Sequence, residues 1–374
     1  MTLTAHGKAV PLGSEREILK AAFLANAGLA DAERTPLPAD ASTRRYERLT
    51  TAGGQSVLLM DAPPLAESPP CDPAWSAEQR HAAGWNAVAR LAAGSVAAFA
   101  AVARHLRSLE LSAPAVHALD TQHGLAVVED FGDNAFARLI ERGTDGQALY
   151  FAAVDALAVL HDAPPPGELP GPGGTWPLLT YDATALKAGA DLFIDWLPKL
   201  KPELSFGPAA RAEWDALWTD IAHRGETGAQ VLAHRDFHAE NLLWLPARKG
   251  AARVGMIDFQ DAVVAHPSWD LHSLLQDARR DVSPELETQV LARYFEHRRE
   301  LDREAFMADY AALAALNEAR ILGIFARLVV RDGKPRYLQF MPRMWRQLER
   351  NLKNPALADL KAWFDRHVPL ESRR

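Results

Sequence analysis

Residues 234–241 (HRDFHAEN) place several polar side chains close together between two short apolar stretches. Each flanking stretch is long enough only for a short strand, so the polar residues are expected in the loop between the strands. A third apolar stretch ends on Asp258, and a hairpin would bring Asp258 next to Asn241. Phosphoryl transfer needs an acceptor for the substrate hydroxyl proton and oxygen ligands for Mg²⁺, which takes only one or two protein ligands beside phosphates and waters. The pattern therefore predicts a phosphoryl-transfer site that contains Asp236, Asn241 and Asp258.

These residues also have simpler interpretations. Asp and Asn favour turns, so each of the three could cap a loop or end a strand. His234 and His238 have the i, i+4 spacing of a zinc-binding helix, but Arg235 stands where such a helix has Glu, and the flanking residues predict strand and loop. The joint pattern His-x-Asp-x-x-x-x-Asn, followed across a hairpin by Ile-Asp-Phe, favours the phosphoryl-transfer interpretation.

The composition is that of an ordinary globular protein, since 48% of the 374 residues are hydrophobic and 24% are charged. The net charge is −7 and no run of Lys or Arg occurs, which argues against a nucleic-acid-binding protein. The single cysteine, Cys71, cannot form an internal disulfide. The first residues lack the apolar segment of a secretory signal, and no apolar run approaches the ~18 residues of a membrane span. We therefore expect a soluble, cytoplasmic protein.

The periodicity of apolar residues changes along the chain. Before residue 129, strands are expected in two hairpins, at 45–50 with 56–60 and at 115–119 with 125–128. After residue 133, most patterns have the helical period. The other expected elements are helices at 15–28, at two places within 74–111, at 146–161, 183–197, 209–222 and several from 269 to 367, short strands at 231–233, 242–245 and 253–257, and a Gly/Pro linker at 164–174. This predicts an α+β fold with a small β-rich N-lobe (1–128), a hinge (129–133) and a large, mainly helical C-lobe (134–374).

Residues 234–241 together with 257–261 (IDFQD) resemble the aminoglycoside phosphotransferase and choline kinase superfamily, whose members are relatives of protein kinases. The resemblance implies a protein-kinase-like bilobal fold and the cofactors ATP and Mg²⁺. It also implies that Asp236 is the catalytic base and that Asn241 and Asp258 are the Mg²⁺ ligands. Two weaker matches agree with it, at 160–162 (LHD) and at 266–271 (HPSWDL), where the aspartate, Asp270, is mostly structural in the superfamily.

Matches to a narrower group extend from about residue 41 to residue 351. They resemble the anomeric N-acetylmuramate/N-acetylglucosamine kinases of bacterial cell-wall recycling. This resemblance implies phosphorylation of the anomeric hydroxyl of an amino sugar to the α-1-phosphate, which a sugar-1-phosphate nucleotidyltransferase would then use. The alanine-rich segment 74–95 matches nothing in the group and is interpreted as an insertion. The matching segments are 41–46, 59–64, 128–133, 257–262, 322–328 and 331–334.

The expected N-lobe departs from the protein-kinase pattern at its phosphate-binding residues. No lysine occurs between Lys20 and Lys187, no acid occurs in 99–109, and neither Gly-x-Gly-x-x-Gly nor a Walker A sequence is present. Either another cation binds the phosphates, or the protein is an inactive nucleotide-binding regulator. Arginine can bind phosphate through two nitrogens, so we expect Arg44 or Arg45 to contact ATP; the alternative is a solvated strand face. The expected ATP-binding residues are Ser42, Thr43, Arg44, Arg45 and Glu129.

The candidate substrate-binding residues come from separate segments. His238 lies two residues after Asp236 and is placed to touch the substrate hydroxyl. Asp191 and Asp195 share one helical face, and Trp196 beside them could stack on a pyranose ring. Surface acids beside a core aromatic residue explain the same pattern, so this interpretation also stays open.

A carboxylate on the substrate would require a cation in the site. For the lactyl carboxylate of N-acetylmuramate, the resemblance indicates Arg327 or Arg331. An aminoglycoside kinase is an alternative, although its polycationic substrate favours a cleft crowded with carboxylates and the segment 363–374 is not strongly acidic. A choline-type kinase needs an aromatic cage for the quaternary ammonium, and the ten tryptophans keep that alternative open.

Overall fold

A five-stranded antiparallel sheet forms the N-terminal part of the computed structural model, which describes residues 12–38, 44–63 and 69–373. The strand order β1-β2-β3-β5-β4 keeps each predicted hairpin together, because β2 pairs with β3 and β4 pairs with β5. β1 adds an edge strand that the apolar pattern did not indicate. The strands are β1 (Glu33–Pro36), β2 (Arg45–Thr50), β3 (Ser56–Asp61), β4 (Val116–Asp120) and β5 (Leu125–Glu129).

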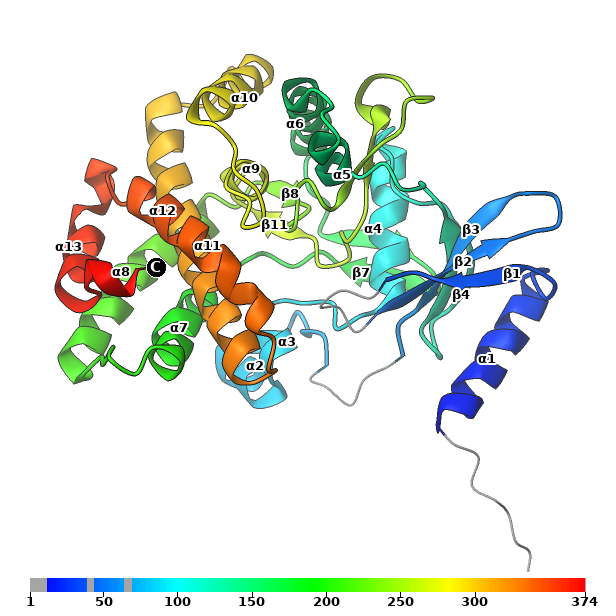
Figure 1. Ribbon diagram of the computed structural model, residues 1–374, viewed down its shortest axis with the longest axis horizontal. Coiled ribbons are helices and arrows are strands. Elements are labelled where there is room, and N and C mark those ends of the chain that lie inside the picture. Colours follow the sequence, from blue (N-terminus) through cyan, green and yellow to red (C-terminus); the bar gives the residue numbers. More distant parts are fainter. Residues whose placement is uncertain (1–11, 39–43, 64–68, 374) are drawn as a thin grey trace, which may run out of the picture.

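The two faces of this sheet are covered differently. α1 (Leu12–Asn26) packs Phe23 and Leu24 against one face. Side chains alternate along β3, so Leu59 belongs to the core under α1, whereas Leu58 faces the other side. α4 (Val96–Ser108) stands on that other side, between the sheet and the helical part of the molecule (Figure 1). The sheet therefore has a closed outer face and an inner face directed at a cavity.

The alanine-rich segment 74–95 before α4, interpreted above as an insertion and called the insertion below, contains helices. It contains α2 (Ala77–Ala83) and α3 (Trp85–Val88), so three helices rather than two lie between 74 and 111. Ser76 begins α2 with a capping box, in which its hydroxyl accepts the Gln79 N–H at 3.2 Å and the Gln79 side chain accepts the Ser76 N–H at 2.8 Å. Gly84, with φ 109°, separates α2 from α3.

Helices dominate the chain after residue 133, as predicted, and most of them gather at the end of the molecule opposite the sheet (Figure 1). At Gly323, α11 approaches α7 so closely that a Cβ would lie 2.3 Å from the Leu192 carbonyl carbon. No helix in the described ranges is both long and apolar enough to cross a membrane. The helices are α5 (Phe136–Glu141), α6 (Gly146–Asp162), α7 (Ala183–Leu200), α8 (Pro208–Thr227), α9 (Ser268–Leu275), α10 (Pro284–His297), α11 (Arg303–Val330), α12 (Met341–Asn351) and α13 (Ala358–His367). This arrangement confirms the predicted α+β bilobal fold.

The interpretation of 164–174 as a linker without structure is wrong. β6 (Glu168–Gly171) and β7 (Gly174–Pro177) form a hairpin that packs on α4, and Leu169 is fully buried in it. Another unexpected strand, β11 (Val263–Ala265), pairs with β8 (Val231–Ala233). Strands of three or four residues are too short for a recognisable alternation of apolar side chains. In β6 and β7, Pro and Gly also have the pattern of a loop.

Candidate active site

A cavity of about 690 Å³ opens between the inner face of the sheet and the helical part. The sheet and the segment 129–133 line one end of it, and α9 and α11 contribute residues to the other. Of the predicted site residues, the cavity brings together Asp236, Asn241, Asp258, Arg44, Glu129 and His238.

The predicted hairpin places Asn241 beside Asp258. β9 (Leu242–Trp244) pairs with β10 (Val254–Met256), with Leu242 opposite Met256. Just beyond this pair, the Ile257 N–H donates to the Asn241 carbonyl at 3.1 Å. The Asn241 side-chain amide donates to the Asp236 carbonyl at 2.9 Å, which fixes the loop that carries Asp236. The three residues are therefore linked through one hairpin and one loop.

Two residues at this site have a left-handed backbone, which is unusual for residues other than glycine. Arg235 has φ 80° and Asp258 has φ 65°. Arg235 is held by the fully buried Asp270, whose carboxylate accepts the His234 N–H at 2.6 Å and the Arg235 N–H at 2.8 Å. Such backbone strain persists where surrounding contacts over-determine it, and it clusters at functional sites. Asp270 therefore has the structural role expected for it.

The Asp236 side chain is half-buried in the cavity wall. Its backbone carbonyl accepts hydrogen bonds from the His238 N–H and the Asn241 side chain. In the described part of the chain, no side chain or N–H donates to its carboxylate, so those oxygens remain available to a ligand in the cavity. A carboxylate in this position can accept the proton of a substrate hydroxyl.

The Asp258 carboxylate accepts hydrogen bonds from two side chains, one far earlier in the sequence and one two residues later. Arg44 donates to it from the residue just before β2, and Gln260 Nε2 donates to it at 3.1 Å. Burial alone would raise the pKa of Asp258, but the charge of Arg44 and these hydrogen bonds lower the pKa below its ordinary value. The carboxylate is thus kept ionised. With Asn241 it provides two hard oxygen ligands, a set that fits Mg²⁺ bound together with phosphates.

The predicted phosphate-binding residues near the start of β2 do not all face the cavity. Arg44 lines the cavity, whereas Arg45 is exposed and does not contribute to its lining. Ser42 and Thr43 lie outside the described residues. Arg48, two residues further along the same face as Tyr46, also lines the cavity, where its guanidinium binds Asp130 at 2.7 Å and Asp133 at 3.0 Å.

Lys20 does not replace the lysine that β3 lacks. Its ammonium binds Glu47 at 2.6 Å and lies 3.7 Å from Asp61, and both acids belong to the outer-face side of their strands. The inner face of β3 instead presents Leu58 to the cavity. The cations that this end of the cavity offers are therefore arginines.

Glu129 ends β5 and lines the cavity, together with the four residues that follow it. Its carboxylate binds Arg248 and accepts the Ala115 N–H at 3.2 Å. These contacts hold the predicted hinge segment against the β9–β10 hairpin on one side and β4 on the other. Glu129 therefore fixes the position of segment 129–133 at the cavity.

The structure does not bring the other candidate substrate residues to this cavity. Asp191 accepts the Lys187 ammonium at 2.7 Å and the Trp214 indole N–H at 2.9 Å, and Asp195 pairs with Arg211 at 3.3 Å. Trp196 lies under the Lys199 ammonium, 3.9 Å from the ring centroid, and the Arg327 guanidinium lies over Trp85 of the insertion, 5.5 Å away. In the described residues, none of Asp191, Asp195, Trp196 and Arg327 lines the cavity. Asp191, Asp195 and Trp196 thus contact other side chains of the helical part.

Sequence reasoning missed the residues at the helical end of the cavity. Asn317 and Arg320 extend into its lining from α11, and residues 276–279 follow α9 there. A signal existed for the first two: polar residues at i and i+3 interrupt the apolar run AALAALNEARILG, which otherwise predicts a buried helix.

The insertion is anchored to both loops of the site. The Arg235 guanidinium donates to the Ala89 carbonyl at 2.8 Å and to the Arg90 carbonyl at 2.9 Å. The Asp261 carboxylate accepts the Ala92 N–H at 2.6 Å. The insertion therefore touches the residue before Asp236 and the segment after Asp258.

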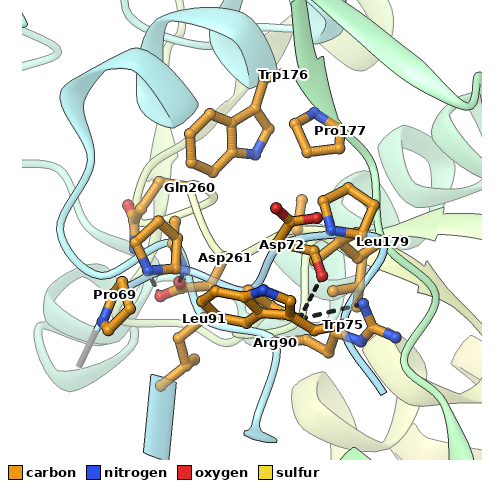
Figure 2. Close-up of a pocket in the computed structure, with 16 residues that line it drawn as sticks. Pro69, Asp72, Trp75, Arg90, Leu91, Trp176, Pro177, Leu179, Gln260 and Asp261 are labelled. Carbon is orange, nitrogen blue, oxygen red and sulfur yellow. Dashed lines mark hydrogen bonds between the residues drawn. The ribbon is translucent and has the colours of Figure 1, made fainter. Parts of the chain in front are cut away.

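A smaller cavity of about 320 Å³ lies between the insertion and the segment after Asp258. Figure 2 shows Trp176 and Pro177 on one side of it and Trp75 on the other. Gln260 and Asp261 contribute to its wall, and the Gln260 amide connects it to the site because Nε2 donates to both Asp258 and Asp261 at 3.1 Å.

Comparison with known proteins agrees with this geometry. The model of the phosphotransferase enzyme family matches residues 33–306. An N-acetylmuramate/N-acetylglucosamine kinase of Caulobacter vibrioides is 59% identical over 363 residues, which cover 97% of this chain and 99% of the relative. The kinase of the same name from Neisseria meningitidis serogroup B is 31% identical, over 86% of each chain.

A solved ethanolamine kinase of Plasmodium vivax has a similar fold. Its TM-score is 0.58 at 11% sequence identity, and the match covers 93% of this chain and 90% of that one. Because the match covers 93% of this chain, both lobes share the kinase-like fold. The family model covers well over half of the chain, and a relative at 59% identity covers nearly all of it, so the chain belongs to the phosphotransferase enzyme family.

Proposed function

We propose that this protein transfers the terminal phosphoryl group of ATP to the anomeric hydroxyl of N-acetylmuramate or N-acetylglucosamine, giving the sugar α-1-phosphate. The observation that carries the proposal is the 59% identity to the Caulobacter vibrioides N-acetylmuramate/N-acetylglucosamine kinase over almost the whole of both chains. The product would serve peptidoglycan recycling, in which a sugar-1-phosphate nucleotidyltransferase would consume it.

The cavity supports a role for each residue of the site. Asp236 accepts the proton of the sugar hydroxyl as that oxygen attacks phosphorus. Asn241 and Asp258 would hold Mg²⁺, which would supply positive charge to offset that of the ATP phosphates. Arg44, which binds Asp258 in this structure, would turn to the phosphates when ATP is bound. His238 lines the same cavity as Asp236 and would orient the sugar hydroxyl.

The test is a substrate panel with the purified full-length protein, ATP and Mg²⁺. N-acetylmuramate, N-acetylglucosamine, choline and kanamycin are compared by ADP release, and each product is then examined by ³¹P and ¹H NMR. We expect turnover of the two amino sugars only, with phosphorus coupled to the anomeric proton. Turnover of kanamycin or choline alone, or phosphate on another sugar carbon, would overturn the proposal. ATP binding without turnover of any acceptor would indicate the inactive regulator.

A further inference from the structure

Arg320 is a cavity-facing cation without a carboxylate partner in the described residues. Among the other arginines of the cavity, Arg44 pairs with Asp258, Arg48 pairs with Asp130 and Asp133, and Arg235 donates to the Ala89 and Arg90 carbonyls. Arg279, which follows α9, also lines the cavity without a carboxylate partner among the described residues, but it lies outside α11 and has no side-chain contact like that of Arg320 with Asn317. The Arg320 guanidinium instead donates to a neutral group, the Asn317 side-chain oxygen, at 3.1 Å. A half-buried guanidinium that lacks a counter-charge is costly, so its presence in a ligand cavity indicates an anionic ligand.

The surroundings of Arg320 hold it at the cavity wall. Its stem lies against α7 at Gly189, where an added Cβ would be only 3.1 Å from Arg320 Cδ. Asn317 is one turn earlier on α11, is 8% exposed, and binds one guanidinium nitrogen. The remaining N–H groups of the fork stay available, and a guanidinium fork can bind a carboxylate through two parallel hydrogen bonds.

The position in the cavity assigns the anion to the acceptor rather than to ATP. Arg44, Asn241 and Asp258, the groups suited to phosphate and Mg²⁺, belong to the sheet end and the two loops. Arg320 belongs to α11 on the helical side, and Asp236, in the loop between β8 and β9, lines the same cavity. N-acetylmuramate differs from N-acetylglucosamine by a lactyl ether on the oxygen of C3, which puts its carboxylate away from the anomeric hydroxyl.

We propose that Arg320, positioned by Asn317 and Gly189, is the subsite for the substrate carboxylate and determines the preference for N-acetylmuramate over N-acetylglucosamine. This assignment rests on the proposed function. It differs from the expectation of Arg327, which lies seven residues further along α11 and stacks on Trp85 instead.

The test compares kcat/KM for both sugars in the wild-type protein and in the variants Arg320→Gln, Arg320→Lys, Arg327→Gln and Arg303→Gln. For Arg320→Gln we expect a roughly 10- to 100-fold loss with N-acetylmuramate and a change of less than about threefold with N-acetylglucosamine, which is the range for a lost hydrogen bond to a charged group. Arg320→Lys keeps the positive charge but loses the guanidinium fork. Its kcat/KM for N-acetylmuramate should therefore lie between the values for the wild-type protein and Arg320→Gln. Arg303, exposed at the start of α11, is the matched control for loss of one arginine from this helix.

A third substrate, the methyl ester of N-acetylmuramate, isolates the carboxylate without changing the protein. The wild-type protein should prefer the acid to the ester by roughly 10- to 100-fold, and Arg320→Gln should not distinguish them. Equal losses with both sugars, no preference for the acid in the wild-type protein, or a selective loss in Arg327→Gln would overturn the assignment. The ester comparison needs no variant to fold, and absence of turnover with either sugar in the wild-type protein would refute the proposed function itself.

Discussion

Asp236 and Asp258 face the same cavity in different surroundings, and this difference fits different roles. The Asp258 carboxylate is fixed by Arg44 and Gln260, which lower its pKa against the effect of burial. The Asp236 carboxylate receives no hydrogen bond within the described ranges, so it can accept one from a substrate. A strongly bound carboxylate suits a metal ligand, and a free one suits a proton acceptor.

Replacing the proposed base should stop chemistry without removing ATP. For Asp236→Asn we expect kcat to fall roughly 10²–10⁴-fold, because the amide cannot accept the hydroxyl proton. ATP affinity, measured by titration calorimetry in the presence of Mg²⁺, should change little. A variant with kcat within about threefold of the wild-type value would show that another group accepts the proton.

Arg44, just before β2, and Arg45, its first residue, offer a matched pair for testing the phosphate contact. Arg44→Gln should raise the KM for ATP roughly 10-fold, since a hydrogen bond to a charged group is lost. Arg45→Gln removes the same charge from the exposed side of the strand and should leave KM unchanged within about twofold. Equal effects of the two substitutions in steady-state kinetics would mean that overall charge, rather than a phosphate contact, is responsible.

At the scale of elements, the insertion connects the two lobes. It leaves the sheet after β3, yet Arg80 and Arg90 both bind Asp182, the N-cap residue of α7, at 2.5 Å and 2.7 Å. It also supplies the carbonyls that hold Arg235, next to Asp236. An N-lobe segment thus stabilises the C-lobe loop that carries the proposed base.

Breaking the anchor of the insertion should destabilise the protein strongly. Asp182→Ala leaves Arg80, which is 2% exposed, without its counter-charge, and it also removes the cap that accepts the Ala185 N–H. We expect the free energy of unfolding, measured by urea denaturation, to fall by about 3–5 kcal/mol.

The control for this variant is another acid of α7 with an exposed arginine partner. Asp195→Ala breaks the 3.3 Å pair with Arg211 and should change the free energy of unfolding by less than about 0.5 kcal/mol. Similar losses in both variants would show that the insertion is not anchored through Asp182.

At the scale of the whole molecule, several histidines are buried as neutral groups in the helical part. His161, His234 and His272 are each at most 3% exposed, and burial lowers the pKa of all three. The pKa of His272 falls to about 3, first through burial and then through the nearby charges of His266 and Arg320. In the unfolded chain the pKa of these imidazoles is about 6.5.

Stability should therefore decrease as the pH falls below about 6.5, because the unfolded chain then binds protons that the folded protein does not. For His272 alone the loss is about 1.4 kcal/mol per pH unit until the pH reaches its lowered pKa, or about 2 kcal/mol between pH 7 and pH 5. Urea denaturation at these two pH values should show a smaller difference in His272→Gln than in the wild-type protein.

The exposed His81 of α2 provides the control for this comparison. His81→Gln should retain the pH dependence of the wild-type protein. An unchanged difference between pH 7 and pH 5 in His272→Gln would mean that other groups account for the loss of stability at low pH.

The sequence by itself determined the features that depend on neighbours along the chain. The hairpins β2–β3, β4–β5 and β9–β10 follow from short apolar runs and the turns between them, and the β9–β10 register alone brings Asn241 beside Asp258. The spacing of Asp236 and Asn241 indicated the same site. The lack of a lysine between Lys20 and Lys187 also pointed to arginines at the sheet end, where Arg44 and Arg48 line the cavity.

Only the tertiary structure decided which side chains face the cavity. α7 turns Asp191 and Asp195 to other partners. Arg320 and Arg327 share one face of α11, and their positions along the helix place Arg320 at the cavity and Arg327 over Trp85. A helical period shows which residues share a face, but the rotation of that face is set by packing against distant segments, here α7 against α11 at Gly189 and Gly323. For the same reason, the contacts of segment 74–95 with Arg235 and Asp261 could not be predicted, because they depend on segments more than a hundred residues away.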